Sequence, residues 1–136
     1  MKITVEAKTP VPRQKAWNVF TTPEYVKEWN AASDDWHTPE ATNDLREGGT
    51  FTYRMAARDG SAAFDFAGTF TAVNEPTHLA YSLEDGRTVT VDFIEDGDAT
   101  LVRETFDADS EATANQERAG WQAILDRFAQ HAAEAD

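Results

Sequence analysis

The chain has 136 residues, of which 40% are hydrophobic, and 25 Asp and Glu against 12 Lys and Arg give it a formal charge of −13. This length predicts one domain covering residues 1–136, and the hydrophobic content excludes a disordered chain. The excess of acidic residues excludes nucleic acids and anionic membranes as expected partners, because both carry negative charge.

The N-terminal segment predicts one strand followed by two short helices. Polar and apolar side chains alternate over residues 2–9, as in a strand with one buried face. Pro12 suits the first turn of a helix, where no backbone donor is needed, and the apolar residues after it have helical spacing. Thr22 and Pro23 predict a second helix, with the Thr22 hydroxyl as its N-cap and Pro23 at its first position.

The next segment, residues 30–50, has a less regular pattern. We expect a loop over residues 30–35 and a strand over residues 36–43. The adjacent glycines Gly48 and Gly49 predict a tight connection, because glycine permits a positive φ or a bulge where a strand begins.

The central segment, residues 51–106, predicts an antiparallel meander. Apolar residues alternate along several short strands, and short turn signals separate them. Such short connections favour antiparallel neighbours. The turn signals are Asp59-Gly60, Asn74-Glu75-Pro76, Asp85-Gly86 and Asp96-Gly97-Asp98.

The last element is expected to be one long helix over residues 113–134. Trp121, Leu125 and Phe128 recur at three- and four-residue spacing, so we expect them to be buried against the sheet. Gly120 lies inside this helix, where glycine costs about 1 kcal/mol relative to alanine. A close approach of the helix to the sheet would explain this glycine, and chance would explain it as well.

Several local motifs resemble those of one known family. They are residues 11–17 (VPRQKAW), residues 21–24 (TTPE) with Trp29, residues 44–49 (DLREGG), residues 68–79 (GTFTAVNEPTHL), and Gly120-Trp121 with Leu125. With the order of the elements, they are similar to the Hsp90-ATPase-activator-homologue-like (AHSA1-type) branch of the START/Bet v 1-like (SRPBCC) superfamily. The resemblance implies an α+β helix-grip fold, in which a curved antiparallel sheet wraps around a long C-terminal helix and two short helices follow the first strand.

The resemblance also implies what such proteins do. Family members bind small apolar ligands, act in cyclase-like or hydrolytic chemistry, or contact a chaperone. This chain departs from the family in two places, because an apolar residue often stands at the position of Glu104 and a histidine is common near Phe106.

Aromatic side chains are the main candidates for a ligand site, because ligand pockets are mostly apolar with a few polar anchors. Plain core packing would use the same kind of residue, and the sequence leaves both interpretations open. The candidate ligand-binding residues are Trp17, Trp36, His37, Tyr53, Phe64, Phe66, Tyr81, Phe93, Glu104 and Trp121.

Glu104 is the most specific polar candidate for the ligand site. Strand alternation places it on the inward face with Val102 and Phe106, and a buried carboxyl without a partner has a raised pKa. Such a group can act as a general acid or base, or it can anchor a polar ligand atom. In a structural role it would instead be paired with an arginine or a tyrosine.

The other polar residues indicate no further chemistry. None of the three histidines has a second ligand at metal-binding spacing, so no metal site is expected, and no serine lies in a nucleophile elbow. We interpret His78 and His131 as surface residues and His37 as a residue near the mouth of a cavity.

The leading hypothesis is a module that binds a small, largely apolar molecule between the sheet and the C-terminal helix, without a cofactor. One alternative is a cyclase-like or hydrolytic enzyme that uses Glu104 with Tyr53, Tyr81 or His37. Another is a domain that modulates a chaperone ATPase, and a homodimer also stays open. The lack of cysteine, of a long apolar run and of a signal-peptide core leads us to expect a cytoplasmic protein.

Overall fold

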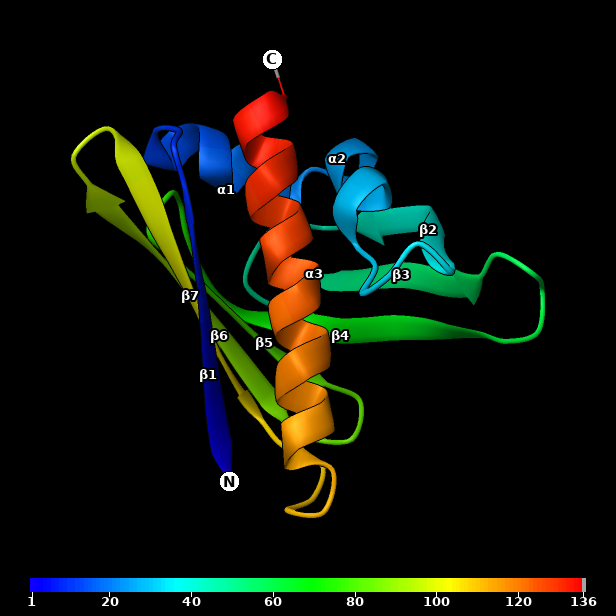
Figure 1. Cartoon of the computed structure of the whole chain (residues 1–136). Helices are drawn as coiled ribbons and strands as arrows, with labels where there is room; N and C mark the ends of the chain where they lie inside the picture. The colour runs from blue at the N-terminus through cyan, green and yellow to red at the C-terminus, as the bar shows by residue number, and fades with distance from the viewer. Residues whose placement is uncertain (136) are drawn as a thin grey trace.

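The computed structural model describes residues 1–135, and in this part of the chain the fold is α+β, with seven strands and three helices. Figure 1 shows their arrangement. In chain order the elements are β1 (Lys2–Thr9), α1 (Arg13–Thr21), α2 (Pro23–Trp29), β2 (Trp36–Asn43), β3 (Thr50–Ala57), β4 (Ala63–Asn74), β5 (His78–Leu83), β6 (Thr88–Asp96), β7 (Ala99–Asp107) and α3 (Ala114–Glu134).

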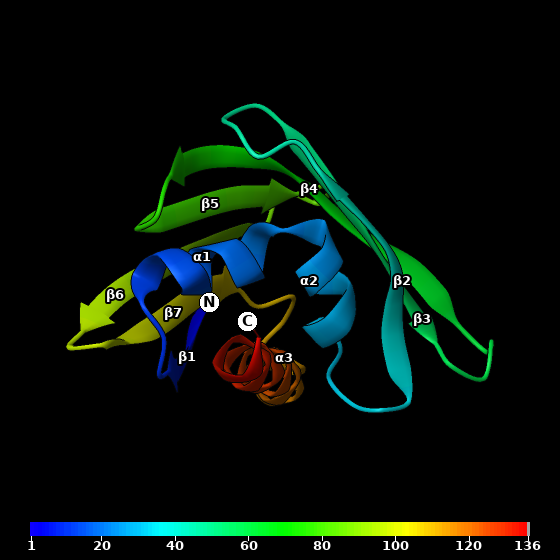
Figure 2. The same cartoon turned by 90° about the horizontal axis from the view of Figure 1, so that it is seen from above.

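The strands form one antiparallel sheet in the order β1-β7-β6-β5-β4-β3-β2. Strands β2 to β7 are paired in chain order, which confirms the predicted meander. The first strand joins the other end by pairing with the last one, so that Ile3 lies opposite Phe106. Figure 2 shows that the sheet curves around α3. The helix-grip fold implied by the sequence motifs is therefore confirmed.

The long helix α3 lies across the concave side of the sheet (Figures 1 and 2). Leu125 and Phe128 are fully buried, as predicted, whereas Trp121 is half-buried. The Trp121 ring stacks on Phe106 of β7 with a centroid distance of 4.1 Å. Within residues 1–135, no helix is both long enough and apolar enough to cross a membrane.

The short helices α1 and α2 close one end of the space between the sheet and α3 (Figure 2). Phe20 of α1 and Trp29 of α2 both contact Phe128 of α3, with ring centroids 5.2 and 5.3 Å apart. Pro23 occupies the start of α2 as predicted. The predicted Thr22 hydroxyl cap is wrong, because the hydroxyl makes no cap hydrogen bond and only the backbone carbonyl of Thr22 accepts from the first turn.

The connection before β3 needs both of its glycines. Gly48 has φ +83°, a conformation that residues with a side chain rarely adopt. A Cβ atom on Gly49 would lie 2.0 Å from the carbonyl oxygen of Asp44. The chain can turn this tightly into β3 only because neither position carries a side chain.

Gly120 has a different environment from the one we expected. A Cβ atom added at this position would meet no heavy atom within 4 Å. The expectation that Gly120 permits a close approach of α3 to the sheet is therefore wrong. The position has room for a side chain, so steric contact does not require glycine there.

Gly49 and Gly120 give a matched pair of alanine substitutions. Gly49→Ala should destabilise the protein by about 1–3 kcal/mol or more, because its Cβ would clash with backbone. Gly120→Ala should stabilise it by about 0.5–1 kcal/mol, because alanine lowers the entropy cost of helix formation and meets nothing. Urea denaturation measures both changes. Equal effects of the two substitutions would contradict this description of the backbone.

Candidate functional site

A pocket of about 270 Å³ lies between the sheet and α3. This volume lies just below the roughly 300–1,000 Å³ range of small-molecule sites. Side chains from every helix and from strands β2, β3, β4, β5 and β7 line the pocket. Most of the wall is aromatic or aliphatic, and its main rings belong to Phe20, Trp29, Phe51, Phe66, Tyr81 and Trp121.

Phe51 organises the aromatic wall of the sheet. It lies opposite Gly68 on β4, and a Cβ atom on Gly68 would come within 3.0 Å of the Phe51 ring. The glycine thus leaves room for the ring to lie across β4. From there the Phe51 ring contacts Tyr81 at 4.9 Å and Phe66 at 5.7 Å between centroids. Such edge and tilted contacts are the preferred geometries of aromatic pairs.

Helix α3 supplies the opposite wall of the pocket. Trp121 and Ile124 are three residues apart, so they lie on the same face of the helix. The Trp121 ring also contacts Phe66 of β4 at 6.0 Å. This contact bridges the helix and the sheet on one side of the pocket.

Six of the ten candidate residues line this pocket: Tyr53, Phe64, Phe66, Tyr81, Glu104 and Trp121. The other four, Trp17, Trp36, His37 and Phe93, do not line it. Trp17 and Phe93 instead contact each other in the fully buried core, with ring centroids 5.3 Å apart.

Trp36 and His37 are the first two residues of β2. Trp36 contacts Phe64 at 5.9 Å between ring centroids. Phe64 lines the pocket and is nevertheless 48% exposed. It therefore marks the solvent end of the pocket.

Several polar lining residues were missed by sequence reasoning, among them Asn43 and Thr21. The Asn43 side-chain amide donates to the Thr21 carbonyl at 2.7 Å and to the Tyr53 hydroxyl at 3.1 Å. It thereby links β2 and β3 to the end of α1. No sequence pattern could have revealed Asn43, because its partners come from two other elements.

Glu104 is the most unusual residue of the pocket. Its neighbours on the inward face are Val102 and Phe106 along β7, with Val5 and Val91 opposite on the adjoining strands. All four are buried and apolar, and Glu104 is only 6% exposed. Within residues 1–135, no hydrogen bond or ion pair reaches its carboxyl group.

The lack of a partner determines the protonation state of Glu104. Burial raises the pKa of this carboxyl group from 4.5 to about 8, because the apolar surroundings disfavour the charged form. The structural alternative, an arginine or tyrosine hydrogen-bonded to Glu104, is absent from the described residues. At neutral pH the carboxyl group is mainly protonated and can donate a hydrogen bond.

Two tyrosines add hydroxyl groups to the pocket. Burial raises the pKa of Tyr81 well above its usual value, and the nearby Glu104 carboxylate raises it further. Burial also raises the pKa of Tyr53, although the hydrogen bond with Asn43 partly offsets this shift. Both tyrosines therefore stay neutral at physiological pH.

Arg87 is the basic residue of the pocket wall. Its Nε donates to Asp85 at 2.7 Å, and its guanidinium lies 3.4 Å from Glu117 of α3. Two acidic partners thus balance its charge at the rim. Arg87 is not the missing partner of Glu104, since no ion pair joins the two residues.

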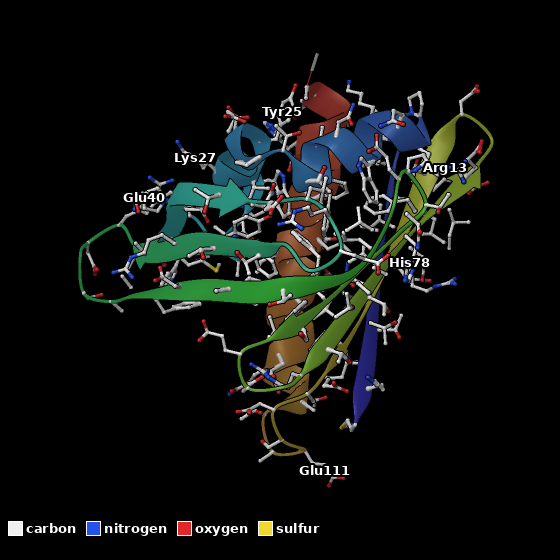
Figure 3. The ribbon with its side chains drawn as sticks, turned by 180° about the vertical axis from the view of Figure 1, so that it is seen from behind. Arg13, Tyr25, Lys27, Glu40, His78 and Glu111 are labelled. Carbon is white, nitrogen blue, oxygen red and sulfur yellow. The ribbon has the colours of Figure 1, made fainter. Side chains whose placement is uncertain are left out.

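The predicted surface histidines are paired with acidic residues away from the pocket. His78 lies 2.7 Å from Asp92, and His131 lies 2.6 Å from Glu28. Figure 3 shows His78 at the other end of the sheet from the β3–β4 hairpin. Among residues 1–135, no cluster of three or more His, Asp or Glu is placed to hold a metal ion.

The arrangement of strands and helices defines an α+β protein of the helix-grip class. The sequence matches the family model described as "Activator of Hsp90 ATPase homolog 1-like protein" over residues 10–133, and the chain belongs to this family. No relative is found among the curated proteins.

Solved structures agree with this family and this fold. An AHSA1-like protein from Aeromonas hydrophila is 47% identical and has a TM-score of 0.90, with 96% of this chain and 91% of that chain covered. Chr148 from Cytophaga hutchinsonii is 40% identical and has a TM-score of 0.84, with 98% and 92% covered. A protein from Nitrosomonas europaea is 18% identical and has a TM-score of 0.86, with 98% and 95% covered, which shows a shared fold.

The buried carboxyl group gives a prediction for stability against pH. Between pH 4.5 and about 8, the unfolded chain has lost the Glu104 proton while the folded protein keeps it. Stability must therefore fall as pH rises through this window, by up to about 1.4 kcal/mol per pH unit. Glu104→Gln removes this pH dependence, because glutamine does not titrate. The free energy of unfolding of Glu104→Gln should therefore increase relative to the wild type by several kcal/mol between pH 4.5 and about 8, and the difference should then stay constant.

Urea denaturation at a series of pH values measures this difference. Glu84→Gln is the matched control, because Glu84 is exposed in the β5–β6 turn and the substitution is the same change of carboxyl to amide. If the advantage of Glu104→Gln were constant across the window, the carboxyl group would not be buried in its neutral form.

Proposed function

We propose that the protein binds a small, largely apolar molecule in the pocket between the sheet and α3. The observation that carries this proposal is the unpaired carboxyl group of Glu104 in an aromatic pocket. The carboxyl group faces the pocket and has no hydrogen-bond partner among the described residues. A ligand can hydrogen-bond with it while covering the aromatic wall, which removes apolar surface from water.

The apolar surface of the protein supports a pocket ligand over a docked protein partner. Among the described residues, the large hydrophobic side chains that are exposed are Met1 and Phe64. A partner surface would need a broader apolar patch. The family description names activation of the Hsp90 ATPase, and the described residues carry no broad apolar patch for such a partner.

An enzymatic role is the second candidate, and one observation favours it. A carboxyl group with a pKa of about 8 suits a general acid near neutral pH. The remaining ionisable groups of the described pocket wall are the neutral Tyr53 and Tyr81 and the ion-paired Arg87. A binding role needs only the apolar wall and the Glu104 carboxyl group. Catalysis would need a second reactive group.

We also propose the cytoplasm as the location of the protein. The chain contains no cysteine, and cysteine-free chains are compatible with a reducing compartment. The ligand would then be a molecule available in that compartment.

The proposal is tested with indole and octanol, two small neutral apolar molecules. Both should cause saturable shifts of amide NMR signals that cluster at pocket residues, and both should raise the melting temperature. Ile124→Trp places a larger ring into the pocket from α3 and should weaken binding at least tenfold. Gln130→Trp adds the same ring on the exposed face of α3 and should leave binding unchanged.

Two outcomes would contradict the proposal. One is the absence of saturable binding by either molecule to the wild-type protein. The other is equal binding by the Ile124→Trp and Gln130→Trp variants, which would place the bound molecule outside the pocket.

A further inference from the structure

The basic residue of the pocket wall has ion-pair partners, whereas the acidic residue has none. The positive charge of Arg87 is already balanced by Asp85 and Glu117. Glu104 has no partner among the described residues, although it is buried and faces the pocket. Among the described residues, the wall therefore has an acidic group without a partner and no basic group without one. Once Glu104 is ionised, this arrangement favours a cation over an anion.

The rest of the wall also favours a cation. Phe51, Phe66, Tyr81 and Trp121 surround the pocket, and the faces of aromatic rings attract ammonium groups. This attraction is stronger where water is excluded. The formal charge of −13 adds a long-range preference, because a negative protein concentrates cations near its surface and repels anions.

We propose that the ligand of this pocket is an apolar amine, whose ammonium group pairs with the Glu104 carboxylate while its hydrocarbon part lies on the aromatic wall. This inference rests on the proposed binding function and specifies its ligand class. It also names the role of Glu104, which is to bind the charged end of the ligand.

The number of protons released on amine binding depends on the protonation state of Glu104 before binding. Glu104 is mainly neutral at pH 7, so pairing with an ammonium group requires it to release one proton to solvent, while the amine keeps its own. At pH 7 this requirement weakens amine binding about tenfold relative to a fully ionised carboxylate. Amine affinity should rise between pH 7 and about pH 8.5 and then level off.

The other ionisable groups near Glu104 do not produce this pH dependence. Tyr81 and Tyr53 have raised pKa values and stay neutral over the range. Arg87 stays charged, with Asp85 and Glu117 as its partners. The strands beside Glu104 present Val5 and Val91, and α3 presents Trp121 and Ile124, none of which titrates.

The test compares octylamine, octanol and octanoate, which share one chain and differ in the end group. Isothermal titration calorimetry at about pH 8 should give octylamine at least tenfold tighter binding than octanol, and octanoate weaker binding than octanol. In Glu104→Gln the ratio of octylamine to octanol affinity should fall below about twofold. In Ile124→Trp binding of all three should weaken, whereas Gln130→Trp should match the wild type.

A second measurement uses only the wild-type protein, so it does not depend on the folding of a variant. Titrating octylamine near pH 7 in two buffers of different ionisation enthalpy should reveal the release of close to one proton per amine bound. Octanol should release none.

Binding of octanol and octylamine with equal affinity would overturn the amine inference and leave the proposed binding function intact. Binding of octylamine without proton release would also overturn the amine inference and leave the proposed binding function intact. If none of the three molecules bound, both the inference and the proposed function would fail.

Discussion

A single helix has to cover a wide sheet, and this constraint shapes the rest of the molecule. Seven strands at a spacing of about 4.8 Å make a sheet about 29 Å wide, whereas a helix with its side chains is about 10 Å across. The sheet therefore curls around α3, and α1 and α2 cover one end (Figure 2). The pocket lies in the space that remains between the sheet and the three helices.

The position of α3 decides which part of the sheet is left uncovered. The helix is attached along the first strand, where the Gln122 side chain donates to the Glu6 carbonyl at 2.8 Å and the Thr9 hydroxyl donates to the Ala129 carbonyl at 2.9 Å. On the other side only side chains such as Trp121 and Ile124 reach toward β3, β4 and β5. Glu104 lies on β7, next to β1, and so marks the boundary between the packed and the hollow part.

The sequence was sufficient to predict the order of elements, the turns and the inward orientation of Glu104. These follow from local rules, namely alternation along a strand and Asp-Gly turn chemistry. Alternation tells which face a residue occupies but not where on that face it lies. For that reason Phe93 of β6 was expected at a ligand, and the helical spacing of Trp17 in α1 has the same limit. The two rings are instead packed together in the core.

Other features of the site depend on contacts between distant segments. The Asn43 amide and the ion-paired Arg87 have partners that only the folded chain brings near. The environment of Gly120 was not predictable from the sequence either. Its sequence context fitted a close approach of helix and sheet, whereas the folded structure has open space there. The unpaired state of Glu104 likewise follows from what surrounds it in three dimensions.

The neutral, unpaired carboxyl group of Glu104 is the central claim, and its titration tests that claim most directly. Selective carbon-13 labelling of glutamate and NMR observation of the side-chain carboxyl signal give the midpoint for Glu104 itself, with Glu104→Gln assigning the signal. We expect a midpoint near pH 8. A midpoint near 4.5, the ordinary value for glutamate, would contradict the burial of an uncharged acid in this pocket.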